Sequence, residues 1–99
     1  MSVAEAIDIG DGVALSTLRV GEGATTVVFI HGYSMSKDCW ARVTPYFPAQ
    51  TYSCVAYDLR GFGDSAKPET GYTMRQHALD FAALLDALNV EKAILIGHS

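Results

Sequence analysis

Polar residues with catalytic potential directly follow two short apolar runs of the sequence. The segment Gly-His-Ser at 97–99 follows the run 93–96, and the segment His-Gly-Tyr at 31–33 follows the run 25–30. A serine hydroxyl is a poor nucleophile unless it is exposed and next to a base, and a sharp turn after a buried strand projects it clear of the sheet. Ser99 is therefore a candidate nucleophile, and the alternative is an ordinary residue of a Gly-His-Ser loop.

Few side chains in this chain could act as the base for such a serine. The histidines are His31, His77 and His98. His98 adjoins the serine, but neighbouring side chains at a sharp turn diverge, so we do not expect it to be the base. We expect His31 to support its turn by hydrogen bonding. We do not expect it to bind a metal, because no second ligand lies at metal-site spacing. His77 is expected to be a surface or packed helix residue. Asp58 and Arg60 are expected to fix their loop through a hydrogen bond or ion pair.

The elements that must position these residues are mainly strands. Continuous β-favouring runs at 25–30, 53–57 and 93–96 predict buried strands. Two weakly alternating runs flank the turn Gly-Asp-Gly at 10–12 and predict an N-terminal hairpin. These patterns indicate a hairpin followed by alternating strands and helices.

Two segments between the strands have helical spacing. The first begins at Ser34 or Ser36 as a cap, is shortened or kinked by Pro45, and carries large apolar residues at Trp40, Val43 and Phe47. The second begins at Thr73 in the capping pattern T-x-x-Q and stops at Asn89. Its predicted buried stripe consists of Met74, Ala78, Phe81, Leu85 and Leu88.

The alternation predicts an α/β fold with a mostly parallel sheet flanked by helices on both faces. In that architecture functional groups gather at the carboxyl ends of the strands. The segments 31–33, 58–61 and 97–99 all follow predicted strands. We therefore expect these three segments to converge on one crevice.

Three motifs resemble the N-terminal part of an α/β-hydrolase. They are "VVFIHGY" followed by Trp40, "YDLRGFGDSAKP", and "LIGHS", which matches the first half of a G-x-S-x-G nucleophile elbow. The motifs have the order of the family, and the resemblance covers essentially the whole chain. It implies that residues 1–99 are the N-terminal part of a single α/β-hydrolase domain, whose C-terminal remainder is absent from this chain.

The resemblance also implies roles for individual residues. Ser99 would be the nucleophile, and the backbone N–H of Tyr33 would supply half of an oxyanion hole. The residues expected to support the two turns are His31, Gly32, Gly97 and His98. At Gly97 a larger side chain is expected to crowd a strained backbone. The second oxyanion donor, the acidic residue and the catalytic histidine would follow Ser99. From their residue types, Tyr33 and Trp40 are each expected to be core or wall of the substrate pocket and not specific substrate readers.

The function implied is that of a serine hydrolase acting on carboxylic esters or related acyl compounds through an acyl-enzyme. Lactonases, perhydrolases and carbon–carbon bond hydrolases share the serine elbow and stay open. Haloalkane dehalogenases and epoxide hydrolases, which "RGFGDSAKP" also resembles, use an aspartate nucleophile, so Ser99 argues against both. The alternative is a ligand-binding receptor on the same scaffold. The isolated 99-residue segment is expected to be inactive.

Composition excludes other classes of function. Apolar residues make up 49% and charged residues 18% of the sequence, which is typical of a packed globular domain. The net charge of -4 argues against nucleic acid and anionic membranes as partners. No apolar run approaches the roughly 20 residues of a membrane span, so we expect a cytoplasmic protein, with Cys39 and Cys54 as free thiols. No cofactor or metal is expected.

Overall fold

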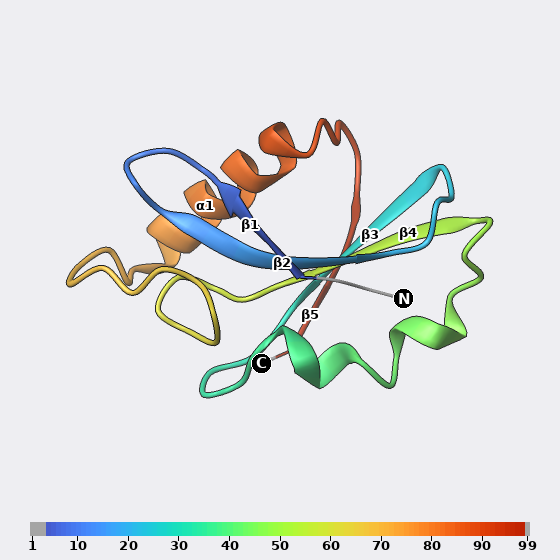
Figure 1. Cartoon of the computed structure of the whole chain (residues 1–99), viewed down its shortest axis with the longest axis horizontal. Helices are drawn as coiled ribbons and strands as arrows, with labels where there is room; N and C mark the ends of the chain where they lie inside the picture. Colours follow the sequence, from blue (N-terminus) through green and yellow to red (C-terminus); the bar gives the residue numbers. More distant parts are fainter. Residues whose placement is uncertain (1–3, 99) are drawn as a thin grey trace.

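A computed structural model describes residues 4–98 of the chain (Figure 1). Its elements, in chain order, are β1 (Ala4–Asp8), β2 (Ala14–Val20), β3 (Thr25–Ile30), the 3-10 helices η1 (Lys37–Trp40) and η2 (Thr44–Tyr46), β4 (Tyr52–Tyr57), α1 (Met74–Ala87) and β5 (Ile94–Gly97). The strands form one sheet in the order β1-β2-β4-β3-β5. The predicted α/β class is confirmed.

β3 lies inside the sheet and pairs in parallel with β4 on one side and β5 on the other. The predicted hairpin of β1 and β2 is antiparallel and joins the sheet through an antiparallel pairing of β2 with β4. The hairpin turn needs left-handed backbone at Gly10, Asp11 and Gly12, with φ of 100°, 54° and 73°. Glycine adopts such angles without steric cost, so the Gly-Asp-Gly sequence fits this turn.

The two faces of the sheet are covered by different layers, as Figure 1 shows. α1 packs on one face, where Leu84 joins Val28 and Val55 in a buried cluster. The segment containing η1 and η2 covers the opposite face, where Trp40 and Phe47 pack against the cluster of Val27, Phe29, Cys54 and Ala56. Strand residues alternate between the two clusters, as the pleat of a strand requires.

The first helical segment differs from the prediction of an α-helix. It forms two 3-10 turns, with Ser36 as the cap of η1 and Pro45 in the first turn of η2. Proline disfavours helical backbone in the residue before it and has no N–H to donate. The segment therefore closes as short turns while its aromatic residues still reach the sheet.

α1 has the predicted ends but a rotated buried face. Thr73 caps its start by accepting the N–H of Gln76 at 3.0 Å. Asn89 ends it at φ 58°, as its N–H donates to Asp86 O and the Val90 N–H donates to Leu85 O. These two hydrogen bonds define a Schellman motif.

The predicted stripe of α1 is wrong at its start and incomplete at its centre. Met74 is 85% exposed and Ala78 is exposed, whereas Leu84, outside the stripe, is fully buried. Asp80 is also buried, and its ion pair with Arg60 neutralises its charge. A charged residue therefore lies on the inward face of α1, where the predicted stripe has only apolar residues. Phe81, Leu85 and Leu88 from the stripe are partly buried against the cluster.

β5 forms an edge of the described sheet, with Ile94 50% and Leu95 53% exposed. The prediction that 93–96 is a buried strand is therefore wrong within residues 4–98, because no other strand pairs with the outer side of β5 there. Within residues 4–98, no helix has the length and apolar character needed to cross a membrane.

The packing of α1 gives a first prediction. In the complete gene product, Leu84→Ala should lower the free energy of unfolding by about 2–5 kcal/mol, because it leaves a cavity under α1. Leu79→Ala on the same helix is the matched control, since Leu79 is 52% exposed, and should change stability by less than about 0.5 kcal/mol. Urea titration of both variants measures this. Equal effects would show that α1 packs through another face.

Candidate active site

The register of the sheet brings three strand ends to one line. Ile30 is paired with Tyr57 on one side and Gly97 on the other. Beyond that line, the N–H of His98 donates to Ile30 O at 3.1 Å. The loops that follow β3, β4 and β5 therefore start side by side, as predicted for the carboxyl ends of parallel strands.

Gly32 and His98 are in close contact at this edge. A Cβ atom built on Gly32 would lie 2.6 Å from His98 Nδ1 and 3.0 Å from His98 O. Any side chain at position 32 would thus displace His98, which explains the glycine. The structure brings four predicted residues together here: His31, Gly32, Gly97 and His98. Ser99, the predicted nucleophile, lies outside the described residues.

Gly97 is not crowded by its described neighbours. Apart from its two chain neighbours, no heavy atom of residues 4–98 lies within 4 Å of a Cβ built there. The crowding that we expected within the turn itself stays a prediction, as does a role in the elbow.

Tyr33 lies in a tight turn closed by a hydrogen bond from the Met35 N–H to Gly32 O at 3.1 Å. Ser34 has φ 66°, a left-handed backbone that favours glycine. Among residues 4–98, no acceptor takes the backbone N–H of Tyr33. This donor is available to a ligand, as an oxyanion hole requires.

His31 holds the start of this turn. The side chain is 2% exposed, and its Nε2 accepts the Leu59 N–H at 3.0 Å. Because Nε2 is an acceptor, the neutral ring carries its proton on Nδ1, which lies 2.8 Å from Gly32 O and donates to it. Both ring nitrogens are therefore engaged, in agreement with the predicted supporting role.

Phe62 is a site residue that sequence reasoning missed. Its ring packs edge-to-face on His31 at 5.3 Å and on Tyr33 at 5.9 Å between ring centroids. Tyr33 itself is 85% exposed. An aromatic residue between two glycines in an otherwise polar loop was the available signal. Tyr33 and Phe62 form an apolar wall beside the free N–H.

Trp40, expected as core or pocket wall, has a core position. Its ring lies 5.0 Å from that of Phe29, in the cluster on the η1 face of the sheet. The η1 turn places the indole against this cluster, where its apolar surface is removed from water. The structure places Trp40 with these core residues and not with Tyr33 and Phe62.

Asp58 is fully buried and joins the loops around the site. Its carboxylate accepts the Lys37 backbone N–H at 2.6 Å, the Lys37 ammonium at 2.9 Å and the Asp64 N–H at 2.8 Å. A Cβ on Gly63 would lie 2.3 Å from this carboxylate, so the loop needs glycine to close over it. The predicted loop-fixing role agrees with these contacts, and Arg60 pairs separately with Asp80 at 2.9 Å.

The charges of this pair stabilise each other. Burial alone would raise the pKa of Asp58, but the N–H groups of Lys37 and Asp64 and the ammonium hold it below its usual value. Burial alone would lower the pKa of Lys37, but the hydrogen bond and charge of Asp58 raise it. Both groups are therefore ionised in the folded protein at neutral pH.

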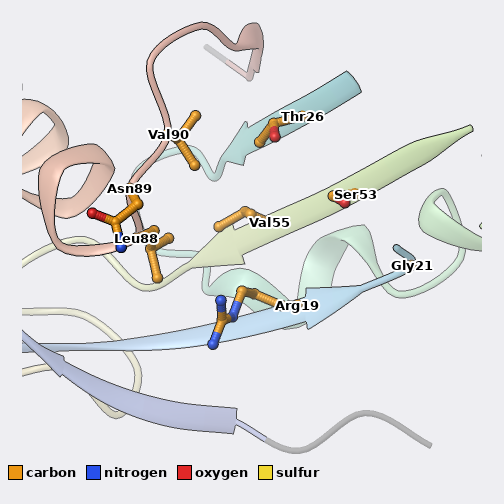
Figure 2. Close-up of a pocket in the computed structure, with 8 residues that line it drawn as sticks. All are labelled: Arg19, Gly21, Thr26, Ser53, Val55, Leu88, Asn89 and Val90. Carbon is orange, nitrogen blue, oxygen red and sulfur yellow. The ribbon is translucent and has the colours of Figure 1, made fainter. Parts of the chain in front are cut away.

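A groove of about 380 Å³ lies at the other end of the sheet (Figure 2). It is lined by Arg19, Gly21, Thr26, Ser53, Val55, Leu88, Asn89 and Val90. Ser53 donates its hydroxyl to Gly23 O at 2.6 Å, and Arg19 pairs with Glu5 at 3.0 Å. The groove brings no base to this serine, and within the described range no group of His, Cys, Asp or Glu could hold a metal ion. The candidate site is therefore the edge with Tyr33 and His98.

The lowered pKa of Asp58 gives a second prediction. Its contribution to stability is present above the unfolded pKa of about 3.9 and is lost as the pH falls through the lower folded value. Asp58→Asn should cost about 3 kcal/mol at pH 7, and its difference from wild type should shrink below about pH 4. Urea titrations from pH 7 to pH 2.5 measure this, with the exposed Asp86→Asn as control. A constant difference across this range would contradict the assignment.

The family model described as "alpha/beta hydrolase fold" matches residues 25–99. A non-heme chloroperoxidase of Streptomyces lividans is 44% identical over 73 residues, which are 74% of this chain and 26% of that protein. A fluoroacetate dehalogenase of Burkholderia sp is 35% identical over 97 residues, covering 93% of this chain and 31% of that protein.

Solved structures agree in fold. The crystal structure of E-2-(acetamidomethylene)succinate hydrolase superposes with a TM-score of 0.92 at 32% identity, covering 100% of this chain and 36% of that one. The chain spans between a quarter and about a third of the length of these proteins. The motifs, the sheet order and the family match agree: the chain belongs to the α/β-hydrolase family.

Proposed function

We propose that the complete gene product is a serine hydrolase that cleaves carboxylic esters or related acyl compounds through an acyl-enzyme. A general base takes the hydroxyl proton as Ser99 Oγ attacks the carbonyl carbon, and the Tyr33 N–H stabilises the oxyanion that forms. The protonated base gives this proton to the leaving group as its bond to the carbonyl carbon breaks. Water, deprotonated by the same base, then attacks the acyl-enzyme and releases the acid, and the proton returns to Ser99. The observation that carries the proposal is the Tyr33 N–H, which has no acceptor among residues 4–98 and lies at the edge where β5 ends just before Ser99.

The base must come from sequence beyond these residues. His31 has both ring nitrogens engaged, so it has no free nitrogen for a serine proton. His77 belongs to α1, and α1 packs on a face of the sheet. His98 neighbours Ser99 in sequence, and adjacent side chains at a sharp turn diverge. The base and its acidic partner are therefore expected from residues after Ser99, in the order that the family uses.

The similar proteins act on different bonds, according to their names. A dehalogenase with an aspartate nucleophile would need a carboxylate at the elbow, and this chain has Ser99 there. Serine favours acyl transfer, because the tetrahedral intermediate of an ester needs the oxyanion donor that Tyr33 offers. The 44% identity to a protein named chloroperoxidase supports hydrogen peroxide as a second acceptor of the acyl group, besides water. An acyl-enzyme can transfer its acyl group to hydrogen peroxide as well as to water.

Labelling by a fluorophosphonate tests the proposal. The complete gene product should react at Ser99 and hydrolyse p-nitrophenyl butyrate, and Ser99→Ala should abolish labelling and lower kcat on the order of a millionfold. Mass spectrometry of the labelled peptide and a steady-state assay measure both. Far-ultraviolet circular dichroism should be unchanged in the variant, because the lost hydroxyl fills little core.

Two outcomes would contradict parts of the proposal. A folded wild-type protein that binds apolar esters without ever labelling at Ser99 would be a ligand-binding receptor instead. Turnover without label at Ser99 would place the nucleophile elsewhere. Faster loss of the acyl group with added hydrogen peroxide, detected as peracid, would identify peroxide as the acceptor.

A further inference from the structure

We propose that Lys37 is a positioning residue, whose buried ion pair with Asp58 sets the geometry of the turn that carries the Tyr33 N–H. The inference rests on the proposed function of that turn as half of an oxyanion hole. It concerns a residue that follows the family motif "VVFIHGY" and lies outside it.

The burial of Lys37 is the first observation. Its side chain is 4% exposed, and that of Asp58 is fully buried. Lysine is almost never buried unless it is paired, because its ammonium loses strong hydration. Lys37 donates hydrogen bonds to both carboxylate oxygens of Asp58, from its backbone N–H to Oδ1 and from its ammonium to Oδ2. The second acid near the ammonium, Asp64, lies farther away at 3.4 Å and is 81% exposed.

The second observation is that the turn is fixed at both ends to neighbouring residues after β4. His31 accepts the Leu59 N–H at the start of the turn, and Lys37 binds Asp58 at its end. The residues between these two anchors are 32–36, including Tyr33. A shift of either anchor therefore moves the Tyr33 N–H relative to β3.

The conformation between the anchors needs such support. Ser34 has φ 66°, which non-glycine residues adopt only when the surroundings hold them there. Tyr33 is 85% exposed and contacts Phe62 through the ring edge, so its side chain gives little restraint. The hydrogen bond from Met35 to Gly32 closes the turn but does not fix it to the sheet.

A charge is required at position 37, and a neutral side chain of similar length cannot replace it. Without the ammonium, the buried Asp58 carboxylate must take up a proton or draw in water, and both change its bonds to the Lys37 and Asp64 N–H groups. Displacement of an oxyanion donor by about 1 Å can cost on the order of 100-fold in rate. The effect should appear in kcat and leave KM nearly unchanged, since the donor acts on charge that forms in the transition state.

Arg60 offers a matched control within the same loop. It forms a mostly buried ion pair with Asp80 through two hydrogen bonds of 2.9 and 3.0 Å. That pair joins the loop after β4 to α1, and among residues 4–98 no side-chain hydrogen bond or ion pair links Arg60 or Asp80 to residues 31–37. Arg60→Met should therefore lower stability without moving the turn.

The experiment compares Lys37→Met, Lys37→Arg and Arg60→Met in the complete gene product. Each is assayed with a p-nitrophenyl ester and the matching thionoester, whose sulfur is a weak hydrogen-bond acceptor at the oxyanion position. Lys37→Met should lower kcat for the ester roughly 10- to 100-fold and reduce the ester-to-thionoester rate ratio. Lys37→Arg should recover part of both, and Arg60→Met should keep the wild-type ratio.

The results separate three cases. An unchanged ratio in Lys37→Met, or an equal fall in Arg60→Met, would overturn the positioning role while labelling at Ser99 still supported the hydrolase. Absence of labelling in the wild type would overturn both proposals. If Lys37→Met does not fold, the double variant Lys37→Met with Asp58→Asn leaves no unpaired buried charge. A fall in the ratio is still expected there, because an amide has one acceptor oxygen for the two N–H groups, of Lys37 and Asp64, that the two carboxylate oxygens accept.

Discussion

A buried carboxylate organises the edge of the sheet that carries the candidate site. Asp58 emerges from β4 without any exposed surface, where an ionised group is stable only if hydrogen bonds and a counter-charge replace water. The chain supplies them from two directions, through Lys37 after the β3 turn and through the N–H of Asp64 in the β4 loop. Because the hydrogen bonds to the Asp58 carboxylate come from both segments, the turn after β3 and the loop after β4 lie against each other.

The sheet register supplies the other half of this arrangement. Because Ile30 pairs with both Tyr57 and Gly97, the three chains leave the sheet at the same level. Gly32 then permits His98 to approach the β3 turn closely. The backbone thus places the Tyr33 N–H, which has no acceptor among residues 4–98, at the edge where β5 ends just before Ser99. The side chains need only hold that backbone in place.

Much of the fold was predictable because its signals are local. The run 25–30 is rich in β-branched residues and the run 53–57 is mostly apolar, so both were recognisable as central strands. The cap at Thr73 and the stop at Asn89 depend on single residues with well-defined hydrogen bonds. The convergence of 31–33 with 97–98 followed from the parallel arrangement alone.

What sequence reasoning missed depends on distant partners. Asp80 is buried only because Arg60 reaches it, so the inward face of α1 was not readable from its apolar residues. Lys37 follows a serine in a polar stretch and gives no sign that it will be enclosed beside Asp58. Trp40 was expected in the core or in the pocket wall, since an indole at this position fits both. Only the three-dimensional packing distinguishes these cases.

The most direct test of the account is a structure of the complete gene product with a boronic acid or phosphonate bound at Ser99. Such an adduct places an oxygen where the oxyanion of the transition state forms. The account predicts that this oxygen lies about 2.7–3.1 Å from the backbone nitrogen of Tyr33, with the turn held in the conformation described. An adduct at Ser99 whose oxygen points away from Tyr33 would contradict it.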